Sequence, residues 1–215
     1  MICVSIAERS AEACLKALSG LDFAEIRMEG MNLTVEDIRT IFSQPLTLMA
    51  TCRPGIMEDG QRRDLLINAI EAGARYVDIE AGSDSRYRQP IINTARAYGC
   101  RVIMSFHDYS KTPPLKTLKQ IISLCFAEGA DIAKIACKVH SERDNIRLLG
   151  LLDREKSEGE LVVVGMGEQG RITRIVAPFL GSPFTYASLA EGKETAVGQV
   201  SKNKLENIMR LIRET

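Results

Sequence analysis

The sequence predicts a closed (β/α)8 barrel of the TIM type, formed by residues 1–215 as a single catalytic domain. Short apolar or β-branched runs alternate with longer stretches of helical periodicity, which is typical of a parallel sheet covered by helices. This alternation occurs eight times along 215 residues, so the barrel is expected to be compact. The alternative, a doubly wound open sheet, needs a glycine-rich phosphate turn after its first strand. The turn Ser5–Arg9 contains no glycine.

The eight predicted strands are Ile2–Ile6, Phe23–Arg27, Leu46–Thr51, Tyr76–Glu80, Arg101–Phe106, Asp131–Ala136, Leu161–Gly165 and Pro183–Tyr186. The eight predicted helices are Ala11–Leu18, Thr34–Phe42, Gln61–Ala72, Ser85–Tyr98, Pro114–Glu128, Ser141–Glu158, Ile172–Phe179 and Lys202–Ile212. Glycines stand where three of the helices should end, at Gly73, Gly99 and Gly129. Two pairs have the pattern of a helix N-cap, Thr34 with Asp37 and Ser141 with Asp144.

The overall charge and the cysteines exclude several classes of function. Lys+Arg and Asp+Glu both total 28, so the net charge gives no reason to expect binding to nucleic acid or to a membrane. The six cysteines form no C-x-x-C pair and no zinc-type cluster with histidine, so we expect reduced thiols, a cytoplasmic protein and no metal. The N-terminal apolar run is too short for a signal peptide, and no run is long enough to span a membrane.

Polar residues gather at the carboxyl ends of the predicted strands, where barrel enzymes place their chemistry. In chain order they are Ser5, Glu25, Arg27, Arg53, Asp78, Glu80, His107 and Lys134. Glu25 and Arg27 are two residues apart and therefore share a face of their strand. Such a pair can face a ligand, or it can form a structural salt bridge. Asp78 is interpreted as a hydrogen-bonded structural residue. Glu80 could be a structural carboxylate at the mouth of the barrel or a residue of the site.

Lys134 is the unusual residue of this set, because lysine is rare in strands and rarely buried without a partner. One interpretation is a side chain that extends outward between the helices and keeps its charge in water. However, the strands of a parallel barrel are buried on both faces, which leaves little water for that lysine to reach. The neighbouring strand ends at His107, and adjacent strands lie only about 4.8 Å apart.

A buried lysine beside a histidine can perform imine chemistry. Burial disfavours the charged ammonium, and a neutral amine can attack a ketone to form a Schiff base. The iminium then withdraws electrons from the adjacent carbon, so that a proton there is easier to remove. His107 can act as the base and later as the acid, because imidazole titrates near neutral pH. A purely structural role for His107 is the alternative; the other histidine, His140, precedes a helix.

Several segments resemble the type I 3-dehydroquinate dehydratase family. Residues 105–113, Ser-Phe-His-Asp-Tyr-Ser-Lys-Thr-Pro, resemble its S-x-H-D-(F/Y)-x-x-T-P signature, and Asp131–Ala136 resembles its Schiff-base strand. The interval from His107 to Lys134 (134 − 107 = 27) is that of the family. Further resemblances cover most of the chain, at Val4-Ser5, Glu25–Arg27, Thr51–Arg53, Gly165–Arg174 and Glu194–Gln199.

This resemblance implies a shikimate-pathway lyase that removes water from 3-dehydroquinate by syn elimination, without a cofactor. It implies that Lys134 forms the imine, that His107 transfers the proton and that Glu58 orients His107. Arg174 would bind the substrate carboxylate, for which a planar guanidinium is well suited. The remaining implied contacts to the substrate are Glu25, Arg27, Arg53 and Gln199, with Ser5 and Thr195 as lesser ones. Family members are often dimers, so a homodimer is expected.

Four departures from the family pattern stand out. Ile26 occupies a position where many members have tryptophan, and Val197 replaces a proline of the family's closing loop, which is Glu194–Gln199 here. Cys137-Lys138 replaces part of a common V-M-P. Glu58 lies five residues after Arg53 rather than four, which weakens its assignment. None of these changes removes a group that the chemistry needs.

Two other functions remain open at this point. A class I aldolase would use the same barrel and imine, and the glycine-rich stretch Gly165–Gly170 could then hold the phosphate of a sugar phosphate. A non-catalytic barrel would bind a ligand without converting it, although the presence of both Lys134 and His107 argues against this. Arg171 is an alternative to Arg174 as the anion-binding arginine, or a solvated helix residue.

Overall fold

The computed structural model describes residues 1–155 and 159–214, and these form a (β/α)8 barrel of the TIM type. Its parallel sheet has the strand order β7-β6-β5-β4-β3-β2-β1-β8. β7 and β8, which end that order, contact each other. The strands are β1 Ile2–Ile6, β2 Phe23–Arg27, β3 Thr47–Thr51, β4 Tyr76–Glu80, β5 Arg101–Asp108, β6 Ile132–Lys138, β7 Glu160–Met166 and β8 Thr185–Ser188.

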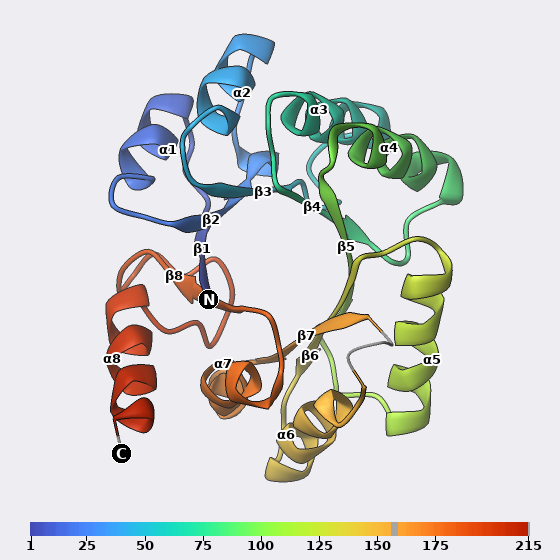
Figure 1. Ribbon diagram of the computed structural model, residues 1–215, viewed down its shortest axis with the longest axis vertical. Helices are drawn as coiled ribbons and strands as arrows, with labels where there is room; N and C mark the ends of the chain where they lie inside the picture. Colours follow the sequence, from blue (N-terminus) through green and yellow to red (C-terminus); the bar gives the residue numbers. More distant parts are fainter. Residues whose placement is uncertain (156–158, 215) are drawn as a thin grey trace. The chain divides into compact units, whose positions relative to one another are not determined.

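The helices alternate with the strands and lie on their outer side (Figure 1). The α-helices are α1 Ala11–Ala17, α2 Val35–Phe42, α3 Asp59–Glu71, α4 Ser85–Tyr98, α5 Leu115–Ala127, α6 Glu142–Leu149, α7 Arg171–Val176 and α8 Lys202–Arg213. Short 3-10 turns are η1 Met28–Gly30, η2 Gly150–Leu152, η4 Glu168–Gly170 and η5 Ala177–Leu180. Of the described helices, none is long and apolar enough to cross a membrane.

The residues predicted to mark the ends of the helices are largely confirmed in that role. Thr34 and Asp37 form a reciprocal capping box at the start of α2. Gly73, Gly99 and Gly129 all have positive φ, the conformation that glycine adopts readily after a helix. The Ser141 side chain does not cap α6, and Asp144 instead accepts a hydrogen bond from the backbone N–H of His140 at 3.0 Å.

Most predicted bounds agree with the structure within two residues, and the largest difference concerns the sixth helix. It was predicted to span Ser141–Glu158, but α6 ends at Leu149 and a 3-10 turn follows from Gly150. The last three residues of that prediction, 156–158, lie outside the described residues. β8 begins two residues later than predicted, at Thr185, whose N–H donates to the carbonyl of Met1 at 3.1 Å.

Contacts between residues divide the chain into two compact units. The first unit contains residues 5–104, and the second contains residues 1–4 and the chain from residue 105 onward. In the first unit β2 pairs with β3, and β3 with β4, in parallel register. In the second unit β6 pairs with β7 along its whole length.

The strands are buried on both faces, as expected for a parallel sheet between helices. Six consecutive residues of β6, Ile132–Cys137, are buried although one of them is Lys134. All six cysteines lie among the described residues, where they are buried and form no disulfide, which agrees with the prediction of reduced thiols.

Candidate active site

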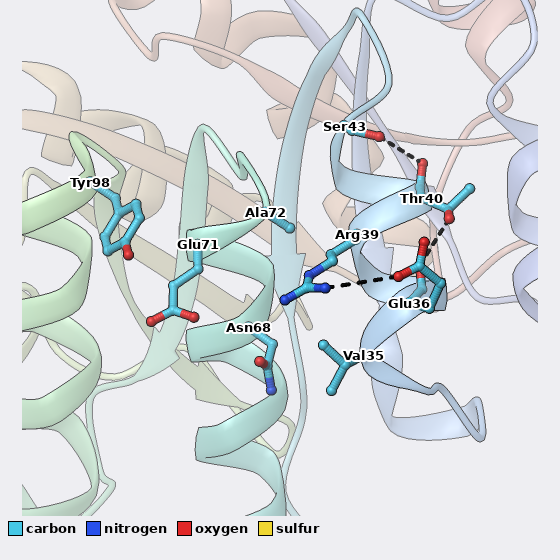
Figure 2. Close-up of a pocket in the computed structure, with 9 residues that line it drawn as sticks. All are labelled: Val35, Glu36, Arg39, Thr40, Ser43, Asn68, Glu71, Ala72 and Tyr98. Carbon is cyan, nitrogen blue, oxygen red and sulfur yellow. Dashed lines mark hydrogen bonds and ion pairs between the residues drawn. The ribbon is translucent and has the colours of Figure 1, made fainter.

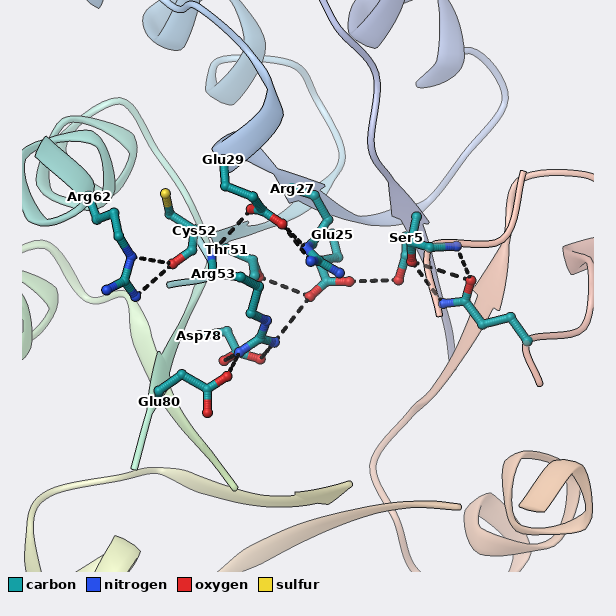
Figure 3. A network of polar contacts seen from close by, with 12 residues as sticks. Ser5, Glu25, Arg27, Glu29, Thr51, Cys52, Arg53, Arg62, Asp78 and Glu80 are labelled. Carbon is teal, nitrogen blue, oxygen red and sulfur yellow. Dashed lines mark hydrogen bonds and ion pairs between the residues drawn. The ribbon is translucent and has the colours of Figure 1, made fainter. Parts of the chain in front are cut away.

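Glu25 is the centre of a buried polar cluster in the first unit (Figure 3). It lies on β2 and is 3% exposed. Its carboxylate accepts hydrogen bonds from the hydroxyls of Ser5, at 2.6 Å, and Thr51, at 3.0 Å. These three side chains come from the neighbouring strands β1, β2 and β3, and the structure thus brings together Ser5 and Glu25, two of the site residues predicted from the sequence.

Arg53 lies just beyond β3 and is held by carboxylates from β4. Its guanidinium donates to both carboxylate oxygens of Asp78 at 2.9 Å and to Glu80 at 2.6 Å, and Glu25 lies 3.8 Å away. Burial by itself would lower the pKa of Arg53, but Asp78, Glu80 and Glu25 raise this pKa well above its usual value. Arg53 is therefore a fixed cation that orders the carboxylates around it.

Arg27 forms its direct ion pair with Glu29, and not with Glu25 as one interpretation of the sequence supposed. The Arg27 guanidinium contacts Glu29 at 2.5 and 2.6 Å. The other oxygen of Glu29 accepts the backbone N–H of Arg53 at 3.2 Å. Glu29 thus connects two predicted substrate-binding arginines. Sequence reasoning missed it because it lies in the 3-10 turn after β2, where a charged residue resembles an ordinary loop residue.

Glu58 is exposed and is the N-cap residue of α3, without a side-chain capping hydrogen bond. The same helix carries Arg62, a second residue that the sequence did not reveal. Arg62 is 2% exposed and donates two hydrogen bonds to the carbonyl of Cys52, at 3.1 and 2.9 Å. It therefore fixes the backbone immediately before Arg53.

Lys134 is buried in the second unit, with only 5% of its surface exposed. Its Nζ lies 4.4 Å from the ring centroid of Tyr186 on β8, a contact in which the ring face attracts a cation. To make this contact the side chain must reach across β7, which separates β6 from β8 in the second unit. Ala187, the next residue of β8, packs against Leu205 and Met209 of α8, so Tyr186 projects to the face away from this helix. Since Lys134 contacts the Tyr186 ring, the outward orientation between the helices, which the sequence left open, is excluded.

His107 is half-buried on β5, the strand next to β6 in the sheet order. Its ring stacks on that of Tyr109, with centroids 5.8 Å apart. Asp108, which follows it, accepts hydrogen bonds from the Ser110 and Lys111 backbone N–H groups at 2.9 and 3.0 Å. Burial would raise the pKa of Asp108, but a hydrogen bond from the Ser110 hydroxyl at 2.7 Å, followed by these two N–H groups, lowers this pKa overall. The turn after His107 is thus stabilised by an ionised carboxylate.

Of the two candidate arginines in α7, Arg174 is buried and Arg171 is exposed. Arg174 is 1% exposed, and its guanidinium donates to the Tyr186 carbonyl at 3.4 Å. Arg171 is about half exposed and lies 3.8 Å from the exposed Glu168. Arg174 and Lys134 both contact Tyr186, so two basic side chains of the second unit share one neighbour.

The loop before α8 is closed by its own side chains. The Gln199 carbonyl oxygen accepts the Thr195 backbone N–H at 2.7 Å, and its amide donates to the Thr195 hydroxyl at 3.1 Å. The N–H of Gly167 donates to the Val197 carbonyl at 3.0 Å. A Cβ on Gly198 would lie 2.2 Å from the carbonyl oxygen of Gly167. This loop therefore packs directly against the end of β7.

The backbone of the glycine-rich stretch Gly165–Gly170 is hydrogen-bonded and closely packed within the chain itself. The N–H of Gly165 donates to the Thr173 hydroxyl at 2.7 Å, and that of Gly170 to the Gly167 carbonyl at 3.1 Å. A Cβ on Gly170 would lie 2.4 Å from the Gly165 carbonyl carbon. The glycines permit this close backbone packing, and the N–H groups of Gly165, Gly167 and Gly170 donate within the chain and not to a phosphate.

A separate hollow lies on the outer side of the first unit, between α2, α3 and the end of α4 (Figure 2). It is lined by Val35, Glu36, Arg39, Thr40, Ser43, Asn68, Glu71, Ala72 and Tyr98. None of the site residues predicted from the sequence lines it. Within residues 1–155 and 159–214, no group of three His, Cys, Asp or Glu side chains is arranged to hold a metal ion.

The fold and the charged side chains at its strand ends define a TIM-barrel enzyme. A model of the type I 3-dehydroquinase family matches residues 2–215, and the chain belongs to this family. It is therefore a lyase of the hydro-lyase class.

Three relatives illustrate how much of the chain this similarity covers. The 3-dehydroquinate dehydratase of Methanosarcina mazei is 35% identical over 224 residues, which cover 97% of this chain and 93% of the relative. That of Methanocaldococcus jannaschii is 32% identical over 221 residues, with 99% of each chain covered. The crystal structure of the 3-dehydroquinate dehydratase from Aquifex aeolicus superimposes with a TM-score of 0.80 at 26% identity and covers 100% of both chains.

Proposed function

We propose that this chain converts 3-dehydroquinate into 3-dehydroshikimate through an imine on Lys134. The observation that carries this proposal is the position of Lys134, a buried amine on β6 that is packed against the Tyr186 ring. A lysine amine can attack a ketone to form a Schiff base, and this one is held within the barrel instead of extending into water. The similarity to relatives that are named 3-dehydroquinate dehydratase supports the choice of 3-dehydroquinate as the substrate.

The chemistry would proceed in four steps. The Lys134 amine attacks the ketone carbon and water leaves, which gives an iminium. His107 removes the C2 proton, and the electrons of that C–H bond form an enamine. The enamine expels the hydroxyl on the neighbouring carbon, which takes the proton back from the imidazolium and leaves as water. Hydrolysis of the conjugated iminium then releases the product and restores the amine.

The other residues bind the substrate in this proposal. Arg174 binds the carboxylate, as a buried guanidinium that can make two parallel hydrogen bonds. The ring hydroxyls are held by Glu25, Arg27, Arg53 and Gln199, with lesser contacts from Ser5 and Thr195. Gln199 must then exchange its hydrogen bonds to Thr195 for bonds to the substrate. In the same proposal Glu58, the N-cap residue of α3, orients His107.

The proposal extends to the whole protein. Residues 1–215 act as a single catalytic domain, since the family match covers nearly all of them. We assign the enzyme to the biosynthetic shikimate pathway, as a cytoplasmic homodimer. The lack of disulfides among the six cysteines, all of which the structure describes, supports a reducing compartment. A sugar-phosphate aldolase is disfavoured, because the Gly165 and Gly170 N–H groups are bonded within the chain.

Borohydride reduction tests the mechanism and the residue together. Sodium borohydride added with 3-dehydroquinate should reduce the imine and leave a stable adduct on the peptide that contains Lys134, visible by mass spectrometry. Lys134→Met should give no adduct. Lys138→Met is the matched control on the same strand, and with saturating substrate it should still give the adduct. An unmodified Lys134 in an active enzyme would refute the imine, and turnover of sugar phosphates alone would refute the substrate.

A further inference from the structure

Lys138 is a second lysine of β6 that the proposed mechanism does not use. It ends the strand, four residues after Lys134, and residues an even number apart on a strand project to the same face. Four residues of strand span about 13 Å, so Lys138 lies well beyond the imine-forming amine and cannot replace it. It is half-buried, whereas Lys134 is buried.

The Lys138 side chain lies against Gly167, in space that a larger residue would fill. A Cβ on Gly167 would lie 2.8 Å from Nζ of Lys138 and 3.4 Å from its Cε. Gly167 is also the residue that donates to the Val197 carbonyl and packs against Gly198. The Lys138 ammonium is therefore positioned beside the loop that carries Gln199.

Lys138 forms no ion pair with the part of the chain that the structure describes. The acidic residue nearest to Gly167 along the chain, Glu168, is exposed and lies 3.8 Å from Arg171. A cation without a carboxylate partner, at the carboxyl end of a barrel strand, attracts anions toward that end.

We propose that Lys138 is a recognition residue that attracts the carboxylate of the incoming substrate toward Arg174 and the closing loop. This inference rests on the proposed function, because it takes the carboxylated substrate from it. Lys138 would act during entry and not in the chemical step. Its removal should therefore lower kcat/KM while kcat stays unchanged.

The test is steady-state turnover of 3-dehydroquinate at low and high ionic strength. For Lys138→Met, kcat/KM should fall about two- to fivefold at roughly 0.01 M salt, where charges act over about 30 Å. The difference should vanish near about 1 M salt, where screening shortens that range to about 3 Å. Lys138→Glu should show a larger loss at low salt, about tenfold. Equal thermal midpoints would exclude misfolding.

Lys119→Met is the matched control, since it removes the same charge from an exposed position on the outer helix α5. It should behave like the wild type at both salt concentrations. A wild-type kcat/KM for Lys138→Met at low salt would overturn the inference, and so would a loss that persists at high salt. In both cases the proposed function would stand. An inactive wild-type chain would overturn the proposed function and this inference together.

Discussion

The Nζ atom of Lys134 lies 4.4 Å from the centre of the Tyr186 ring. Both side chains are buried, and they come from β6 and β8 of the same unit. The flat ring restricts the lysine side chain to few conformations, so that its amine is held in one place before any ketone arrives. Such preorganisation is one of the ways in which a protein accelerates the attack of a nucleophile.

Replacement of Tyr186 should therefore slow imine formation. Tyr186→Phe keeps the ring face and should form the borohydride-trapped adduct at close to the wild-type rate. Tyr186→Leu loses the ring face, and we expect adduct formation to slow about tenfold or more. Time-resolved trapping and mass spectrometry measure this rate. If the leucine variant formed the adduct as quickly as the phenylalanine variant, the ring would have no positioning role.

His107→Ala should separate imine formation from elimination. Without the imidazole, turnover should fall about 10²- to 10⁴-fold, because no other group in the proposal carries the C2 proton. The Lys134 adduct should still appear after borohydride treatment. His140→Ala is the control, as it removes the other histidine, which is exposed and whose Nε2 lies 2.7 Å from the Ser110 carbonyl. Near-normal turnover of His107→Ala would remove its assigned role.

Gly198→Ala should displace the closing loop. The new Cβ would lie 2.2 Å from the carbonyl oxygen of Gly167, and φ at this position is +87°. Because Gln199 follows directly, we expect KM for 3-dehydroquinate to rise at least tenfold. Gly192→Ala is the control: it has a similar φ of +78°, with no atom within 4 Å of the added Cβ. It should cost about 1–2 kcal/mol of stability without a comparable change in KM. Equal KM values for the two variants would contradict the close-contact argument.

The fold was largely predictable because each strand is a short apolar run and each helix end carries a local signal. β1, β2, β4 and α4 begin and end where the sequence indicated. β5 continues two residues past its predicted end, through His107 and Asp108, because polar residues at the end of a barrel strand resemble a loop in sequence. The sixth helix was predicted too long, since its apolar pattern continues through the 3-10 turn from Gly150.

The candidate site was less predictable, because ion pairs depend on which residues the fold brings together. The two-residue period of a β-strand predicted that Glu25 and Arg27 share one face. The ion-pair partner of Arg27 is nevertheless Glu29, from the turn that follows the strand. The hydrogen bonds from Arg62 to Cys52 join residues ten apart through the geometry of the turn between β3 and α3, for which sequence has no simple pattern. By contrast, the burial of Lys134 followed directly from its position in an apolar strand.

Cys52 should be unreactive in the folded protein at neutral pH. Burial, followed by the charge of Glu29, raises the pKa of its thiol to about 11. The reactive form is the thiolate, and with this pKa only about one thiol in a thousand is ionised at pH 8. The shift is upward, so the thiol stays protonated until the pH approaches 11 and its reactivity should increase only there. Burial also raises the pKa values of Cys14 and Cys137, both to about 12.

Alkylation with iodoacetamide, followed by mass spectrometry of the peptide that contains Cys52, measures this reactivity. At pH 8 the folded protein should remain unmodified at Cys52 over the time in which a small-molecule thiol reacts fully. Urea-unfolded protein is the control, and all six cysteines should then react, since an exposed cysteine has a pKa near about 8.5. Rapid modification of folded Cys52 at pH 8 would mean that the turn held by Arg62 opens readily, and that the backbone before Arg53 is not fixed as the two hydrogen bonds to the Cys52 carbonyl imply.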